Sequence, residues 1–321
     1  MSTKIGAFVA SACFPRPPSA VSVPPNGPDV VTRHFDGVTV HVVNTGWVRV
    51  KTAHRSYAGP DALRFPAIAF GRAWTELMPV LVTVVEHPEG IYLVDAGMSE
   101  ETLDKNHFAT DPVTAFVYGH FLDFRFSPSQ RIDRRLGALG IDVAQVRGVI
   151  LTHRHADHSD AVAHLDPATE IYVGARDWPS HAGALPSAFP SGVAPTLVRE
   201  GEGDPLGAFS HVRSLTRDGR VAIVPLAGHS PGHLGLVVRT PGLDVVIAGD
   251  ATFSLEDLAA RRIAGIVEEP ALARGSLDVL AEHVTRFPTS LLLSHDPVLL
   301  DRFRRAETTT LPSAKAKHGA E

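Results

Sequence analysis

The sequence predicts a single α/β domain with four layers, in which helices cover the outer faces of two sheets. Along the chain, a strand-rich stretch is followed by helical patterns, and the same order is then repeated. Apolar residues make up 44% of the 321 positions and charged residues 20%, which is typical of a protein with a large core. No linker-like segment divides residues 37–306, so we expect one domain over this range.

The two ends of the chain lie outside the predicted domain. Residues 1–36 are rich in proline and are expected to form an extended arm, whereas the polar residues 307–321 are expected to be disordered. The apolar run 5–13 resembles a short export signal with Cys13 at a lipid-attachment position, but it is short and interrupted by glycine. A cytoplasmic location is therefore the prediction, with export through this segment as the alternative.

Composition excludes several functional classes. The formal net charge of -5 provides no basic surface for a nucleic acid. No run of about 18 apolar residues is present, so no segment is predicted to span a membrane. The single cysteine excludes an internal disulfide and a thiolate-rich metal site. The expected partner is a small-molecule substrate, and a homodimer remains open.

The first half of the domain is predicted to be rich in strands. The expected strands have β-branched and aromatic runs and cover 37–44, 47–51, 80–87 and 90–97. Residues 54–78 are expected to form a loop near a functional site. The aromatic residues of 106–128, including Phe116 and Tyr118, are interpreted either as core under a helical insertion or as the wall of an apolar substrate pocket.

The second half repeats the pattern after a helix that ends at Gly140. The expected strands cover 146–151, 170–173, 221–226, 234–240, 243–248 and 290–294. The expected helices cover 129–139, 157–165, 254–264 and 272–287. Residues 178–218 are expected to be mostly loop, because proline, glycine and serine are frequent there.

Three histidines and an aspartate fall within six residues, directly after the apolar run 146–151. Side chains two apart on an extended backbone point the same way, so His153 and His155 are expected on one side. Asp157 and His158 follow at the turn into a helix. Ligands from a strand end and a helix start diverge by the distance that separates two neighbouring metal ions, roughly 3.5–4 Å. A solvated histidine-rich loop is the alternative.

Other ligand-type residues stand where later strands end: His229, Asp250 and His295. His233 is an alternative ligand to His229 in the same glycine-rich segment. Asp95 also ends a predicted buried strand, and a buried carboxylate needs a partner. It is interpreted either as a turn cap or as an acceptor for a metal-bound histidine.

The motif His153-x-His155-x-Asp157-His158, followed by His229, Asp250 and His295, resembles the metallo-β-lactamase-fold hydrolases over about residues 37–300. The resemblance implies an αββα sandwich with a dinuclear site in the cleft between the sheets. It implies one metal held by His153, His155 and His229, and a second held by Asp157, His158 and His295. It also implies that Asp250 bridges both metals.

Within that family, the chain most resembles the quorum-quenching N-acyl homoserine lactonases. The hairpin over 79–97 and the segment 292–296 carry this resemblance, together with the spacing of the later ligands. The chain departs from that branch at Phe253, where its members typically carry a tyrosine near the substrate carbonyl. It departs again at Ser159-Asp160-Ala161, where many members have a glycine pair.

The predicted function is that of a metal-dependent hydrolase of the lactonase or esterase type. A hydroxide bridging two metals is expected to attack the carbonyl of a lactone or ester, and an N-acyl homoserine lactone is the substrate that the resemblance favours. Asp157 is expected to relay the proton, and Asp250 to bridge the two metals. Zn²⁺ suits imidazole and carboxylate ligands best, although Mn²⁺, Co²⁺ or Fe²⁺ also fit. Phe253, Phe116 and Tyr118 are the expected pocket residues. The alternatives are a glyoxalase II-like thioesterase, a phosphotriester hydrolase and a non-catalytic metal-binding domain.

Overall fold

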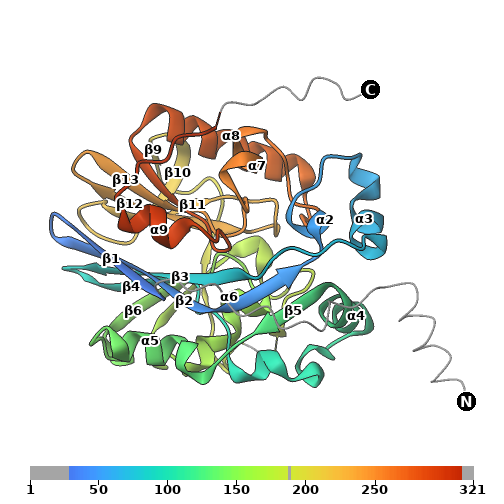
Figure 1. The fold of residues 1–321 in the computed structure, drawn as a ribbon. Helices are drawn as coiled ribbons and strands as arrows, with labels where there is room; N and C mark the ends of the chain where they lie inside the picture. The colour runs from blue at the N-terminus through green and yellow to red at the C-terminus, as the bar shows by residue number, and fades with distance from the viewer. Residues whose placement is uncertain (1–28, 187–188, 313–321) are drawn as a thin grey trace, which may run out of the picture.

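Two facing sheets with helices on their outer sides make up the molecule, so the predicted αββα sandwich is confirmed (Figure 1). The computed structural model describes residues 29–186 and 189–312. The export-like segment that ends at Cys13 lies outside the described residues, as does most of the predicted C-terminal tail. No helix in the described part of the chain is long and apolar enough to cross a bilayer.

The first sheet has the strand order β1-β2-β3-β4-β6-β7-β8, and β5 pairs with β2. Its strands are β1 Val30–Phe35, β2 Val38–Val50, β3 Met78–His87, β4 Gly90–Val94, β5 Leu122–Arg125, β6 Val146–Ile150, β7 Glu170–Gly174 and β8 Thr196–Val198. Strands β1 to β4 are antiparallel, whereas β4, β6, β7 and β8 are parallel. The parallel strands therefore deliver the residues that follow them to a common edge of the sheet.

The second sheet has the strand order β14-β13-β12-β11-β10-β9. Its strands are β9 Asp204–Leu206, β10 Phe209–Ser214, β11 Val221–Pro225, β12 Leu234–Thr240, β13 Leu243–Ile247 and β14 Thr289–Leu292. The pair β13 and β14 is parallel, so the segments that follow both strands leave the sheet at the same edge.

The helices lie on both outer faces of the sandwich and at its ends, and the last of them packs between the sheets (Figure 1). They are α2 Thr52–Arg55, α3 Arg64–Phe70, α4 Pro112–Phe121, α5 Ile132–Ala138, α6 Ala156–Ser159, α7 Leu255–Ala259, α8 Pro270–Arg286 and α9 Leu299–Arg304. Short 3-10 turns occupy Asp61–Leu63, Glu100–Leu103, Lys105–Phe108, Pro128–Gln130, Val143–Gln145, Asp160–His164 and Ala175–Asp177.

The hydrophobic core lies in three layers because the central strands are buried on both faces. Side chains of the two sheets, such as Ile150 and Leu236, pack against each other in the middle layer. On β6, the neighbouring Val149 points to the opposite face and packs with Leu136 of α5. The outer face of the second sheet packs against α8 through residues such as Leu277. This explains the continuous apolar runs of these strands.

Several segments differ from the sequence-based expectation. Residues 30–35, which we assigned to the extended arm, form β1 at the edge of the first sheet. The expected loop over 54–78 contains α3, whose Pro66 sits in the first helical turn, where its missing N–H costs nothing. The expected loop over 178–218 contains β8 and β9, which have three residues each, and the six-residue β10, which is mostly polar in sequence. Helix α9 was not expected.

Candidate metal centre

The seven residues expected to be metal ligands lie together at the edge where the strands of both sheets end. They follow β6, β11, β13 and β14 and are His153, His155, Asp157, His158, His229, Asp250 and His295. Their candidate ligand atoms form compact groups, with the atoms of each group within 4.8 Å of one another. All are buried except His155, which is partly exposed. Residues more than 140 positions apart in the chain therefore converge on one point.

The ligand atoms divide into two triads of the composition that the resemblance implied. The first triad is His153, His155 and His229, and the second is Asp157, His158 and His295. In the first, Nδ1 of His155 lies 2.8 Å from Nε2 of His153 and 3.2 Å from Nε2 of His229. In the second, Nε2 of His295 lies 3.3 Å from Nε2 of His158. Zn–N bonds in a tetrahedral site imply ligand separations of about 3.3 Å.

Asp250 stands between the triads and presents one oxygen to each. Its Oδ2 lies 3.7 Å from Nε2 of His229. Its Oδ1 lies 3.3 Å from Nε2 of His295 and 3.5 Å from Nε2 of His158. This is the arrangement that a carboxylate needs in order to bridge two cations. Asp250 also completes a third group of close ligand atoms with His153 and His158.

The hydrogen bonds of the rings fix which nitrogen of four histidines faces the centre. Nδ1 of His158 faces the Asp95 carboxylate at 2.8 Å, and Nδ1 of His295 donates to the Pro79 carbonyl at 2.9 Å. Nε2 of His155 donates to the Ala182 carbonyl at 3.1 Å, which leaves its Nδ1 for the cluster. Nδ1 of His153 lies 3.0 Å from the Thr152 hydroxyl, which leaves its Nε2 for the cluster. Imidazole tautomers of metal ligands are commonly fixed in this way.

Asp95 is buried behind the cluster and forms a hydrogen bond with the candidate ligand His158. Its carboxylate accepts hydrogen bonds from the Thr152 N–H at 2.8 Å and the Thr152 hydroxyl at 3.0 Å, in addition to His158. Asp95 is 1% exposed and has a φ of 67°, a conformation that costs a non-glycine residue roughly 1–2 kcal/mol. The surrounding bonds hold this conformation, and they join the end of β4 to the end of β6.

The loop that carries His229 is held by a buried aspartate that the sequence analysis did not identify. Asp177 accepts hydrogen bonds from the Ser230 hydroxyl at 2.6 Å and the Gly232 N–H at 2.5 Å. His181 and Glu268 form a second support: Nδ1 of His181 bonds Glu268 at 2.9 Å, and the His181 ring lies 5.3 Å from that of His155. No motif signals these residues, because they come from irregular segments far apart in the chain.

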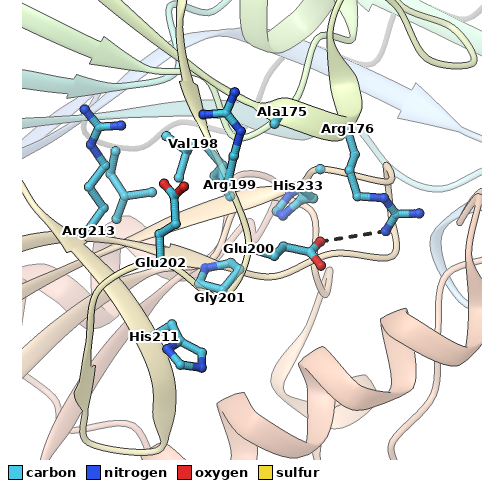
Figure 2. Close-up of a pocket in the computed structure, with 14 residues that line it drawn as sticks. Ala175, Arg176, Val198, Arg199, Glu200, Gly201, Glu202, His211, Arg213 and His233 are labelled. Atoms are coloured by element: carbon cyan, nitrogen blue, oxygen red, sulfur yellow. Dashed lines mark ion pairs between the residues drawn. The ribbon is translucent and has the colours of Figure 1, made fainter.

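His233, the alternative ligand, has a different position. Its Nε2 accepts a hydrogen bond from the backbone N–H of Asp250 at 3.2 Å, and it belongs to none of the compact ligand groups of the described residues. It also lines a small pocket beside Arg176, Arg199 and Arg213 (Figure 2). At about 20 Å³ this pocket holds roughly one water molecule, and none of the seven clustered residues lines it. His233 therefore fixes the turn that presents Asp250.

Burial and charge set the protonation of the cluster. Burial lowers the pKa of His155 to about 4 and the pKa of His153 and His229 well below the ordinary value, so these rings are neutral at pH 7. Burial alone favours a protonated Asp250, but His295 and His158 outweigh it and hold the pKa of Asp250 well below its usual range. Burial opposes charge on His158 and His295, but the neighbouring Asp250 outweighs it and raises the pKa of both rings. A metal ion would therefore displace protons from these two rings on binding, whereas the other three imidazoles and Asp250 already have the forms that bind metal.

The donor set fits divalent metal ions. Oδ1 of Asp250 is buried and makes no hydrogen bond among the described residues, its near neighbours being Nε2 of His295 and of His158. An ionised, buried carboxylate oxygen without such a partner is costly, and a cation in the centre would satisfy it. The donors are imidazoles and carboxylates with no thiolate, a combination that suits Zn²⁺ and also Mn²⁺, Co²⁺ and Fe²⁺.

A cavity of about 210 Å³ opens onto the cluster. Its polar end contains His155, Asp157, Asp250 and His295. Its walls are mostly apolar and include Val48, Val50, Met78, Val117, Leu122 and Ile266. Of the expected pocket residues, Tyr118 and Phe253 line this cavity, and Phe253 stacks on His295 with ring centroids 5.5 Å apart. Phe116 is not among the lining residues and instead packs on His120 and Phe121.

Comparison with known proteins agrees with the fold and the motif. Residues 75–295 match the family described as the metallo-beta-lactamase superfamily. The chain is 25% identical over 243 residues to the N-acyl homoserine lactonase AttM of Agrobacterium fabrum, and the alignment covers 71% of this chain and 86% of that protein. It is 28% identical over 230 residues to a probable metallo-hydrolase of Mycobacterium tuberculosis, and that alignment covers 68% of this chain and 72% of that protein.

Solved structures share the same fold. An N-acyl homoserine lactone hydrolase with N-hexanoyl-L-homoserine bound at its catalytic metal centre is similar with a TM-score of 0.65 and 19% identity, over 84% of this chain and 96% of that chain. The dizinc quorum-quenching lactonase AidC is similar with a TM-score of 0.56 and 14% identity, over 84% of this chain and 90% of that chain. The resemblance inferred from the sequence is confirmed.

Proposed function

This chain belongs to the metallo-beta-lactamase superfamily of metal-dependent hydrolases, and we propose that it hydrolyses a lactone or ester at a dinuclear metal centre. The observation that carries the proposal is the position of Asp250, which presents one oxygen to each of two ligand triads at the end of an apolar cavity. His153, His155 and His229 would hold one metal, and Asp157, His158 and His295 the other.

Divalent metals bound by these residues would lower the pKa of a bound water to about 7 and would polarise a carbonyl oxygen. The chain contributes the surrounding proton chemistry. Asp157 lines the cavity, and its Oδ2 lies 3.5 Å from Nε2 of His295, so it is placed to accept a proton at the boundary between cluster and cavity. Asp95 and Thr152 hold the His158 ring in the tautomer that binds metal.

The cavity favours an acyl substrate. Its walls are apolar apart from the cluster end and a few polar residues, so an apolar chain is buried while the reacting carbonyl lies beside Asp157 and Asp250. Burying one methylene of such a chain contributes about 0.8 kcal/mol. A lactone with an acyl chain, as in the N-acyl homoserine lactones hydrolysed by AttM, is the substrate class that we propose for this chain.

A substrate panel tests this proposal. We expect zinc-loaded protein to hydrolyse an N-acyl homoserine lactone with a higher kcat/KM than a glutathione thioester or a phosphotriester. We expect Asp250→Ala and His155→Ala to lower kcat/KM by more than about 100-fold. Removal of a residue that only bonds a metal ligand typically costs about 10- to 100-fold. Preference for the thioester or the phosphotriester would replace the lactone with that substrate. Full activity of both variants would refute the dinuclear mechanism.

A further inference from the structure

His54 is a buried histidine of the cavity that the metal centre does not use. It belongs to the short helix α2 and is 7% exposed. The Gly265 N–H donates to the His54 carbonyl at 3.0 Å, and the Tyr57 N–H donates to the Ile263 carbonyl at 3.2 Å. These two bonds fasten the helix to the segment after α7, so the position of the imidazole is set by the fold.

Nδ1 of His54 is buried and has no hydrogen-bond partner among the described residues. His233 and His283, two other buried histidines outside the ligand cluster, also keep one ring nitrogen without a hydrogen bond among the described residues, but neither lines this cavity, whereas His41 pairs with Thr32 and Glu86. A buried polar nitrogen that is left unpaired costs about 1–3 kcal/mol. Nδ1 is sealed from solvent, so Nε2 is the ring nitrogen left to contact a molecule in the cavity that opens onto the cluster, which His54 lines.

The position of His54 separates it from the proposed ligands. It is a member of none of the compact groups of ligand atoms formed by the described residues, and both triads are complete without it. The cavity residues around the same helix and its neighbouring strand are Val48, Val50, Phe65 and Ile266, all apolar. His54 is therefore a hydrogen-bonding group set into the apolar wall, where it can recognise a polar atom of a bound acyl chain.

We propose that His54 contacts the substrate and hydrogen-bonds a polar group, such as a secondary amide, that lies beside the reacting carbonyl in an otherwise apolar acyl substrate. This inference rests on the proposed lactone or ester hydrolysis. Burial lowers the pKa of His54 to about 3, so the ring is neutral at pH 7 and offers one donor and one acceptor. Its contribution is to substrate selection, and the metal ligands remain the other seven residues.

Two lactones of equal chain length test the inference, one with an amide in the chain (an N-acyl homoserine lactone) and one without it (an alkyl lactone). For zinc-loaded His54→Leu we expect kcat/KM to fall about 10-fold or more on the amide lactone and less than about twofold on the alkyl lactone. His54→Gln keeps a donor and an acceptor near the position of Nε2 and is expected to recover part of the loss. His41→Asn changes a buried histidine that does not line the cavity, and it should leave the ratio of the two activities unchanged.

Binding separates this inference from the proposed function. Calorimetry with the ring-opened N-acyl homoserine needs no turnover, and we expect the affinity of His54→Leu to be about 10-fold or more below that of the wild type. Equal loss on both lactones, unchanged affinity for the amide compound, or loss of zinc from His54→Leu would each overturn the role of His54. Wild-type protein that binds the amide compound through His54 but hydrolyses neither lactone would instead refute the proposed function.

Discussion

Replacing Asp95 by asparagine should weaken metal binding through a change of tautomer at His158. Both carboxylate oxygens of Asp95 accept hydrogen bonds: Oδ1 from the Thr152 N–H at 2.8 Å, and Oδ2 from Nδ1 of His158 at 2.8 Å. Asparagine has only one acceptor oxygen. If Thr152 keeps it, the asparagine NH₂ group faces Nδ1 of His158 and moves the ring proton to Nε2, the nitrogen that points into the centre.

The structure sets the expected magnitudes. Asparagine tolerates the positive φ of Asp95, so the backbone conformation survives. One mismatched buried hydrogen bond costs about 1–3 kcal/mol of folding stability, and loss of an outer-sphere partner costs about 10- to 100-fold in metal affinity. Asp95→Ala leaves both the Thr152 N–H and the His158 Nδ1–H unpaired, at about 2–6 kcal/mol, which approaches the total stability of many domains. Asp95→Asn is therefore the informative variant.

Competition with a chromogenic chelator measures the effect, and urea unfolding of the metal-free proteins measures stability. Asp296→Asn is the matched control, because Asp296 is also buried and adjacent to the proposed ligand His295, but its carboxylate bonds Arg302 and the Val298 N–H. We expect the control to lose stability and to keep its metal affinity. Metal affinities of Asp95→Asn within twofold of the wild type at both sites would refute the reasoning.

Three further outcomes are expected. Gly249→Ala should lower metal content, measured by elemental analysis, and stability, measured by thermal unfolding. Gly249 has a φ of 53°, and an added Cβ would lie 2.8 Å from Nε2 of His233, the atom that bonds the Asp250 N–H. In urea unfolding, His107→Gln should cost more stability at pH 6 than at pH 9. The hydrogen bond to Asp160 raises the pKa of His107, so the charged pair stabilises the fold below that pKa, and this stabilisation is lost as the pH rises through it. Chelation of the metal should lower the unfolding midpoint, and returning zinc at 1,000 times its Kd should restore about 4 kcal/mol; an unchanged midpoint would contradict metal binding to the folded state.

The sequence was sufficient to predict the sandwich and to gather the seven candidate ligands. The strands that deliver them are short, mostly apolar and largely buried, such as β6 and β13, and the ligands stand in the segments that follow these strands. Strand direction then places these ends at one edge, so local patterns were enough. Asp95 was also found in this way, because it terminates β4.

The supporting residues could not be predicted, for a physical reason. Asp177 bonds the loop of Ser230 across 53 positions, and His181 bonds Glu268 across 87 positions. These contacts depend on how irregular segments fold over the strand ends, and neither their spacing nor their residue types form a pattern. His54 was not identified for the same reason, since its significance lies in the cavity that it lines.

The most direct test of the central claim is an anomalous diffraction map of zinc-loaded crystals recorded at the zinc absorption edge. We expect two peaks, one within about 2.0–2.2 Å of ligand atoms of His153, His155 and His229, and one at the same distances from Asp157, His158 and His295, with Asp250 bound to both. A single peak, or peaks away from these residues, would contradict the dinuclear centre.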